Sequence, residues 1–118
     1  MPIQSWSEEI TVAELHDDPA CTDDLNTLID QLASQCVVDV VIDFANVSYL
    51  NSSNIAKLLK LRKLVVINAH RKMVLSAINS HVWGVFLITG LDRLFEFADS
   101  VSLGLASVQI DSDTSSDE

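Results

Sequence analysis

The stretch VVDVVIDF at residues 37–44 constrains the fold more than any other segment of this chain. It is rich in β-branched residues, which favour strands, and it is largely apolar on both sides. One side would carry Val38, Val40, Ile42 and Phe44, and the other Val37, Asp39, Val41 and Asp43. A strand of this kind lies inside a sheet that is covered on both faces. The segment therefore predicts the central strand of a parallel sheet.

Strand-like and helix-like patterns alternate along the rest of the chain. A half-buried strand is predicted at 8–15 and an amphipathic helix at 22–35, with Thr22 as its N-cap. The further elements are a helix at 53–68, a strand at 71–79, a helix at 81–89 closed by Gly90, a strand at 93–98 and a helix from about 99. This alternation predicts an α/β fold, a mostly parallel mixed sheet of four to five strands covered by about four helices.

The length and the ends of the chain indicate one domain. At 118 residues the chain is long enough to form a single core, which we place at residues 1–110. The last residues, 111–118, read DSDTSSDE and are expected to be a disordered acidic tail. No signal peptide and no membrane span are visible, so we expect the cytoplasm. Cys21 and Cys36 lie at opposite ends of one predicted helix, too far apart for a disulfide.

Charge and residue types exclude several classes of function. The formal net charge is −10, which disfavours binding to nucleic acid. Six of the seven basic residues nevertheless fall between Lys57 and Lys72. The three histidines have no metal-ligand spacing, and three glycines cannot form a phosphate-binding loop. We therefore expect no enzymatic activity, no metal and no cofactor.

The sequence NSSN at 51–54 lies where the central strand gives way to a helix. One serine is needed at most to cap that helix, so two interpretations stay open: a cap only, or a cap beside a hydroxyl that accepts phosphate. Leu61 and Leu64 lie outside the main apolar stripe of the helix, where they could meet a partner or be buried under other elements.

Two longer segments resemble the STAS domain family, the fold of bacterial anti-sigma factor antagonists. VVDVVIDFANVSYLNSSNIAKLLKL resembles the family's central segment, and LITGLDRLFEFADSVSLGL resembles its C-terminal part. In the family an aspartate, a serine or threonine, a small residue and a glycine open the helix. These positions correspond to Asn51, Ser52, Ser53 and Asn54, so the aspartate and the glycine are both replaced by asparagine.

The resemblance implies a protein-binding switch that is not an enzyme. An antagonist of this kind binds an anti-sigma factor, often a serine kinase, which phosphorylates it, and a phosphatase reverses the modification. The resemblance also implies that Ser52 is the phosphoacceptor. The partner-contact surface is predicted at Asn51, Ser53, Asn54, Lys57, Lys60, Leu61 and Leu64. The alternative is a STAS adaptor that is not phosphorylated, serving as a scaffold subunit in a signalling or lipid-transport complex.

Overall fold

The segment that the sequence places at the centre of a sheet does form the central strand. The computed structural model describes residues 3–5, 9–33 and 38–117, and of these the side chains at 4–5 and 110–117 are left aside. The sheet has the strand order β1 (Ile3–Ser5), β2 (Ile10–His16), β3 (Asp39–Asn46), β4 (Met73–Ser76) and β5 (Glu96–Ala98). Strands β2 to β5 are parallel, and β1 is antiparallel to β2. The predicted fold class is confirmed, although the sequence did not predict β1.

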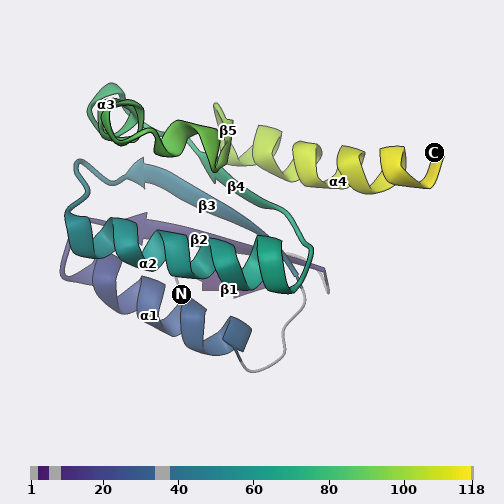
Figure 1. Cartoon of the computed structure of the whole chain (residues 1–118), viewed down its shortest axis with the longest axis horizontal. Coiled ribbons are helices and arrows are strands. Elements are labelled where there is room, and N and C mark those ends of the chain that lie inside the picture. Colours follow the sequence, from purple (N-terminus) through teal and green to yellow (C-terminus); the bar gives the residue numbers. More distant parts are fainter. Residues whose placement is uncertain (1–2, 6–8, 34–37, 118) are drawn as a thin grey trace.

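Helices cover both faces of this sheet, as the apolar central strand requires. Helices α1 (Ala20–Ala33) and α2 (Ser52–Arg62) pack side by side on one face, and α4 (Val101–Asp117) lies across the other (Figure 1). Alternate residues of β3 point into the two layers: Val40, Ile42 and Phe44 face α1 and α2, while Val41 faces α4. The division of this strand into two sides is therefore as the sequence predicts.

Gly104 brings α4 close to the sheet. A Cβ atom at this position would lie 3.0 Å from Cγ1 of Val41 and 3.5 Å from Cγ1 of Val74. Such a contact is tighter than ordinary packing allows, so only glycine fits without a shift of the strand residues. A glycine that weakens the helix in isolation thus permits its closest approach to β3 and β4.

Several boundaries differ from the sequence prediction for local reasons. Helix α1 begins two residues earlier than expected, because the Asp18 carboxylate accepts the Thr22 backbone N–H at 2.9 Å and its hydroxyl at 2.7 Å. Thr22 is thus inside the first turn and is not the cap. Helix α2 continues as the π-helical segment η1 (Lys63–Asn68), so together they span the predicted helix.

The C-terminal half agrees with the prediction in order but has shorter strands. Helix α3 (Ser80–Thr89) is capped by Asn79 and ends at Gly90, which has the left-handed φ of 76° that favours glycine. A 3₁₀ turn, η2 (Leu91–Arg93), ends at the first residue of the last predicted strand, and β5 begins only at Glu96. The backbone of α4 is helical to Asp117, where the sequence predicts a tail. The division into a domain and a disordered tail stays a prediction.

A buried ion pair joins β3 to the segment before β4 at the amino end of the sheet. Asp39, the first residue of β3, is 4% exposed and accepts hydrogen bonds from Arg71 Nε at 3.0 Å and Nη2 at 3.1 Å. It also accepts the Lys72 backbone N–H at 2.9 Å. The bidentate pair satisfies a carboxylate that would otherwise be buried at a cost, and it raises the pKa of Arg71. It therefore fixes the register at which β4 joins β3.

Candidate functional site at the start of helix α2

Asparagines, and not serines, cap helix α2. Asn51 precedes the helix in an extended conformation, and its side-chain oxygen accepts the Asn54 backbone N–H at 2.8 Å. The Asn54 side-chain oxygen accepts the Asn51 backbone N–H at 3.1 Å, which completes a reciprocal capping box. The sequence interpretation gave the cap to a serine, which is wrong for Ser52 and for Ser53 alike. Both serines are already helical, whereas a capping side chain must come from the extended residue before the helix.

The two asparagines also bind a carboxylate from another loop. Asn51 Nδ2 donates to Asp18 Oδ2 at 2.7 Å. Asn54 Nδ2 lies 3.3 and 3.4 Å from the two Asp18 oxygens and 3.3 Å from the Thr22 hydroxyl. Asn54 is only 1% exposed, so its amide is a buried group whose hydrogen bonds are all made inside the protein. Asp18 therefore joins the starts of α1 and α2.

The neighbouring Asp17 holds the loop that leads into α2. Its two oxygens accept the Ser48 backbone N–H at 2.7 Å and the Ser48 hydroxyl at 2.8 Å. These bonds lower the pKa of Asp17, and the hydrogen bond from the Thr22 hydroxyl, followed by that from Asn51, lowers the pKa of Asp18. Both carboxylates are thus favoured in their charged form.

The role of Asp17 and Asp18 was missed in the sequence, where HDDPA looks like an ordinary polar turn. One signal was present: a parallel sheet brings the loops after neighbouring strands to the same edge. The asparagines at 51 and 54 can donate hydrogen bonds where the family's aspartate and glycine cannot. Two acidic residues after β2 and two amide side chains after β3 are therefore complementary.

The serine hydroxyls are left exposed by this arrangement. Ser52 and Ser53 are the first two residues of α2, and both are exposed. Within the part of the chain that the structure describes, neither hydroxyl makes a hydrogen bond, because the asparagines already satisfy the cap. Each hydroxyl is therefore available to another molecule.

The predicted contact residues further along α2 separate into two groups. Lys60 is exposed, Lys57 is half-buried, and both belong to the outer side of the helix with Ala56 and Lys63. Leu64 is half-buried against the core. Leu61 is completely buried, so its predicted place on a partner-contact surface is wrong, and the side chain of Asn54 is equally out of reach.

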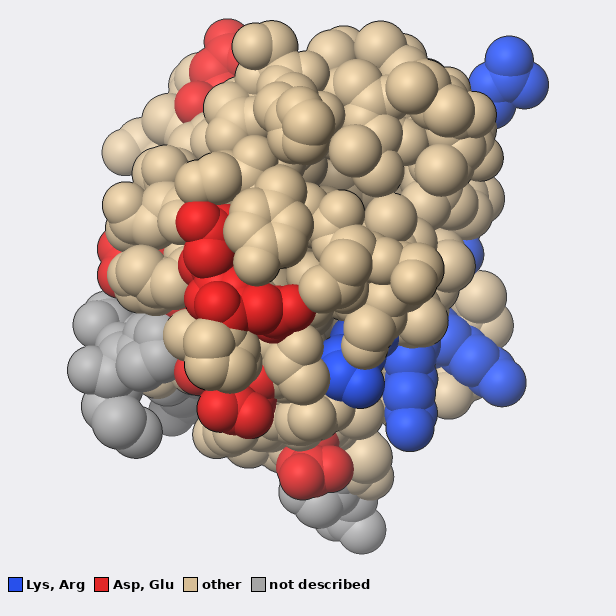
Figure 2. Space-filling model, turned by 90° about the vertical axis from the view of Figure 1, so that its left-hand side faces the viewer, with Lys and Arg blue, Asp and Glu red and all other residues tan. Residues whose placement is uncertain are grey.

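The surface around this site is strongly divided by charge. Figure 2 shows the end of the molecule where α1 and α2 begin, with acidic side chains gathered near its centre and basic ones beside them. The upper part of this face is nearly free of charge. Helix α3 lies in that half of the molecule (Figure 1), and its Trp83, Leu87 and Ile88 side chains are exposed.

The described residues provide few groups for other chemistry. Among them, no three histidine, cysteine or acidic side chains are close enough to hold a metal ion. Cys21 is a buried free thiol, and burial raises its pKa to about 12, while Cys36 lies outside the described residues. Of the helices described, none is long and apolar enough to cross a membrane.

Comparison with known proteins agrees with the fold. The structure superposes on a serine-to-glutamate variant of RsbS from Moorella thermoacetica, with a TM-score of 0.80, 18% identity, and coverage of 95% of this chain and 97% of that one. It also superposes on the anti-sigma factor antagonist SpoIIAA in its unphosphorylated form, with a TM-score of 0.74, 17% identity, and coverage of 91% and 94%.

A third structure is the Bacillus cell fate determinant SpoIIAA in its phosphorylated form, with a TM-score of 0.63, 19% identity, and coverage of 82% of this chain and 89% of that one. No curated protein sequence matches the chain significantly. The family model of the STAS domain matches residues 5–103. The chain therefore belongs to the STAS domain family.

Proposed function

We propose that this chain is a regulatory protein-binding domain of the anti-sigma factor antagonist type, with no catalytic activity of its own. It binds an anti-sigma factor that is itself a serine kinase, and phosphorylation of Ser52 releases the complex. A phosphatase reverses the modification, and the cycle operates in the bacterial cytoplasm. The observation that carries the proposal is the Ser52 hydroxyl, exposed and without a hydrogen-bond partner among the described residues.

The structural relatives support a phosphorylation switch as the mode of regulation. SpoIIAA has been solved in a phosphorylated and an unphosphorylated form, and RsbS as a serine-to-glutamate variant. A phosphoserine carries about −1.5 to −2 charges at pH 7. Added to the first turn of α2, that charge changes the binding surface without any need to unfold the helix.

Two details of this chain bear on its departures from the family pattern. The negative charge that Asn51 lacks is present at Asp18, which accepts a hydrogen bond from the Asn51 amide at 2.7 Å. The side chain that replaces the family's glycine, Asn54, points into the protein and is 1% exposed. It therefore leaves the outer side of the helix start open to a kinase.

The two serines differ in what surrounds an added phosphate. Lys57 follows Ser53 by four residues, so one turn of helix places a cation next to a phosphate on Ser53. Ala56 follows Ser52 at the same spacing, so the negative charge of a phosphate on Ser52 is not neutralised by such a partner. The proposed contact surface comprises Asn51, Ser52, Ser53, Lys57, Lys60 and the half-buried Leu64.

The test compares matched substitutions at the two serines. The full chain is incubated with ATP and each serine-kinase anti-sigma factor of the source organism, and the phosphorylated residue is located by mass spectrometry. Binding of the same kinases to Ser52→Asp, Ser52→Ala, Ser53→Asp and Ser53→Ala is then measured by calorimetry. We expect phosphate on Ser52 and weaker binding of Ser52→Asp alone. Phosphate absent from Ser52, together with equal binding of Ser52→Asp and wild type, would contradict the proposal.

A second function, a scaffold subunit that is never phosphorylated, is favoured by Asp18. Its carboxylate binds the residue next to Ser52, so a phosphate there is repelled by a nearby like charge. In this case Ser52→Asp and Ser52→Ala enter the assembly as well as wild type does. Native mass spectrometry of the purified assembly distinguishes the two functions, because only the switch predicts that Ser52→Asp is lost from it.

A further inference from the structure

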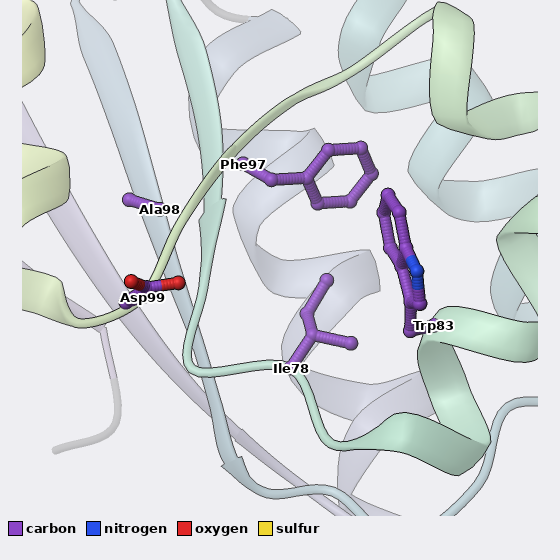
Figure 3. Close-up of a pocket in the computed structure, with 5 residues that line it drawn as sticks. All are labelled: Ile78, Trp83, Phe97, Ala98 and Asp99. Carbon is purple, nitrogen blue, oxygen red and sulfur yellow. The ribbon is translucent and has the colours of Figure 1, made fainter.

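A pocket of about 300 Å³ opens beside helix α3, and its lining does not include the residues assigned to phosphorylation. It is lined by Ile78, Trp83, Phe97, Ala98 and Asp99. Figure 3 shows the Trp83 and Phe97 rings on one side of this space and the Asp99 carboxylate on the other, with Ile78 between them. The volume lies at the lower end of the range for small-molecule sites.

The fold fixes the aromatic wall of this pocket. Trp83 comes from the first turn of α3 and Phe97 from β5, and their rings meet edge to face with centroids 4.9 Å apart. Phe97 makes a second edge contact with the buried Phe86, with centroids 5.5 Å apart. Trp83 is nevertheless 37% exposed. A ring that is held on one edge and open on the other offers a flat surface to a ligand.

The charge at the pocket has one sign. Asp99 is the one charged residue of the lining, it is exposed, and no cation pairs with it among the residues that the structure describes. Asp17 and Asp18 follow β2 at the same edge of the parallel sheet, and the whole chain carries a net charge of −10. Such a field attracts cations and repels anions.

We infer that this pocket binds a small organic cation, an ammonium or guanidinium group on a flat apolar body. The apolar body packs against Trp83, Phe97 and Ile78, and the cationic group binds the Asp99 carboxylate. The indole face adds a cation–π attraction when the charge lies within about 6 Å of the ring. The residues of this site are distinct from Ser52 and from the proposed contact surface.

The test uses three probes of the same shape and different charge. The full chain is titrated with 2-phenylethylammonium, 2-phenylethanol and 3-phenylpropionate, and binding is followed by NMR through the indole N–H of Trp83 and the amides of Ile78 and Asp99. A Trp6→Phe variant identifies the Trp83 signal, since the chain has two tryptophans. An exposed ion pair and a cation–π contact together predict binding of the cation about five-fold tighter than the alcohol.

Two variants and one control show whether the named residues cause the preference. Asp99→Asn is expected to reduce the preference for the cation, because the ion pair is lost, while Asp30→Asn, the same change at an exposed site on α1, leaves it unchanged. Trp83→Leu, followed through the amides of Ile78 and Asp99, is expected to weaken binding of both the cation and the alcohol, and of the cation more, because the cation–π contact is lost as well. The inference is overturned if no probe shifts the three signals, if the three probes bind equally, or if Asp99→Asn behaves like Asp30→Asn.

Discussion

Replacement of Asn54 by alanine tests the capping network most directly. The change removes the acceptor of the Asn51 backbone N–H and the donor to Asp18 and Thr22. A helix cap contributes about 1 kcal/mol and a partly buried hydrogen bond about 0.5–1.5 kcal/mol. Alanine returns about 0.5 kcal/mol through its higher helix propensity. We therefore expect the free energy of unfolding to fall by about 2 kcal/mol, which for a domain of this size lowers Tm by about 8 °C.

Urea unfolding followed by circular dichroism measures this difference, and Asn26→Ala is the matched control. Asn26 is an exposed helical asparagine on α1, so its replacement is expected to change stability by no more than about 0.5 kcal/mol. A second variant, Asn54→Gly, restores the residue of the family pattern and is expected to lose about 1 kcal/mol more than Asn54→Ala. If Asn54→Ala unfolds within about 0.5 kcal/mol of wild type, the network does not stabilise the start of α2.

Three further predictions concern other described groups. Arg71→Ala leaves a buried carboxylate without its cation and is expected to lower the free energy of unfolding by about 2–3 kcal/mol, a value between those for buried and for surface pairs. Glu96→Ala breaks an exposed pair with a lysine at 3.0 Å and is expected to lower it by less than about 1 kcal/mol, both measured by urea unfolding. In a Cys36→Ser background the Cys21 thiol, whose pKa is about 12, is expected to stay unreactive toward a thiol-specific dye at pH 8 until urea unfolds the chain; labelling of the folded chain would contradict this. The lowered pKa of Asp18 stabilises the folded chain fully above the ordinary value of 3.8, and this stabilisation is lost as the pH falls through the pKa of the folded state. Tm measured at decreasing pH is therefore expected to fall less steeply in Asp18→Asn than in wild type. Equal slopes would contradict this assignment.

The order of elements could be read from the sequence because it depends on local patterns. The β-branched run ending at Phe44 is buried on both faces, as its composition predicts. The end of α3 at Gly90 was predictable because glycine tolerates the left-handed φ that often ends a helix. The short β1 strand carries no such pattern, since three residues cannot display an alternation.

The candidate site was only partly predictable because its contacts join distant segments. Ser52 was placed correctly at the start of a helix and is exposed. The cap was misassigned to serine, because propensity ranks serine and asparagine almost equally and only the backbone decides which residue precedes the helix. Leu61 was misplaced because η1 and the neighbouring elements cover a wider face of the helix than its main apolar stripe suggests. The Asp18 contacts span more than thirty residues and leave no local signal.

The shared carboxylate of Asp18 couples the positions of the N-terminal ends of helices α1 and α2. Asp18 accepts hydrogen bonds from the first turn of α1 and from the cap of α2, so a displacement of either helix start removes bonds from the other. A spectroscopic label on the exposed Asn26 of α1, which lies outside the proposed contact surface, is therefore expected to respond to displacement of the start of α2. Partner binding is then expected to change the signal of this label, although the label itself does not obstruct the partner.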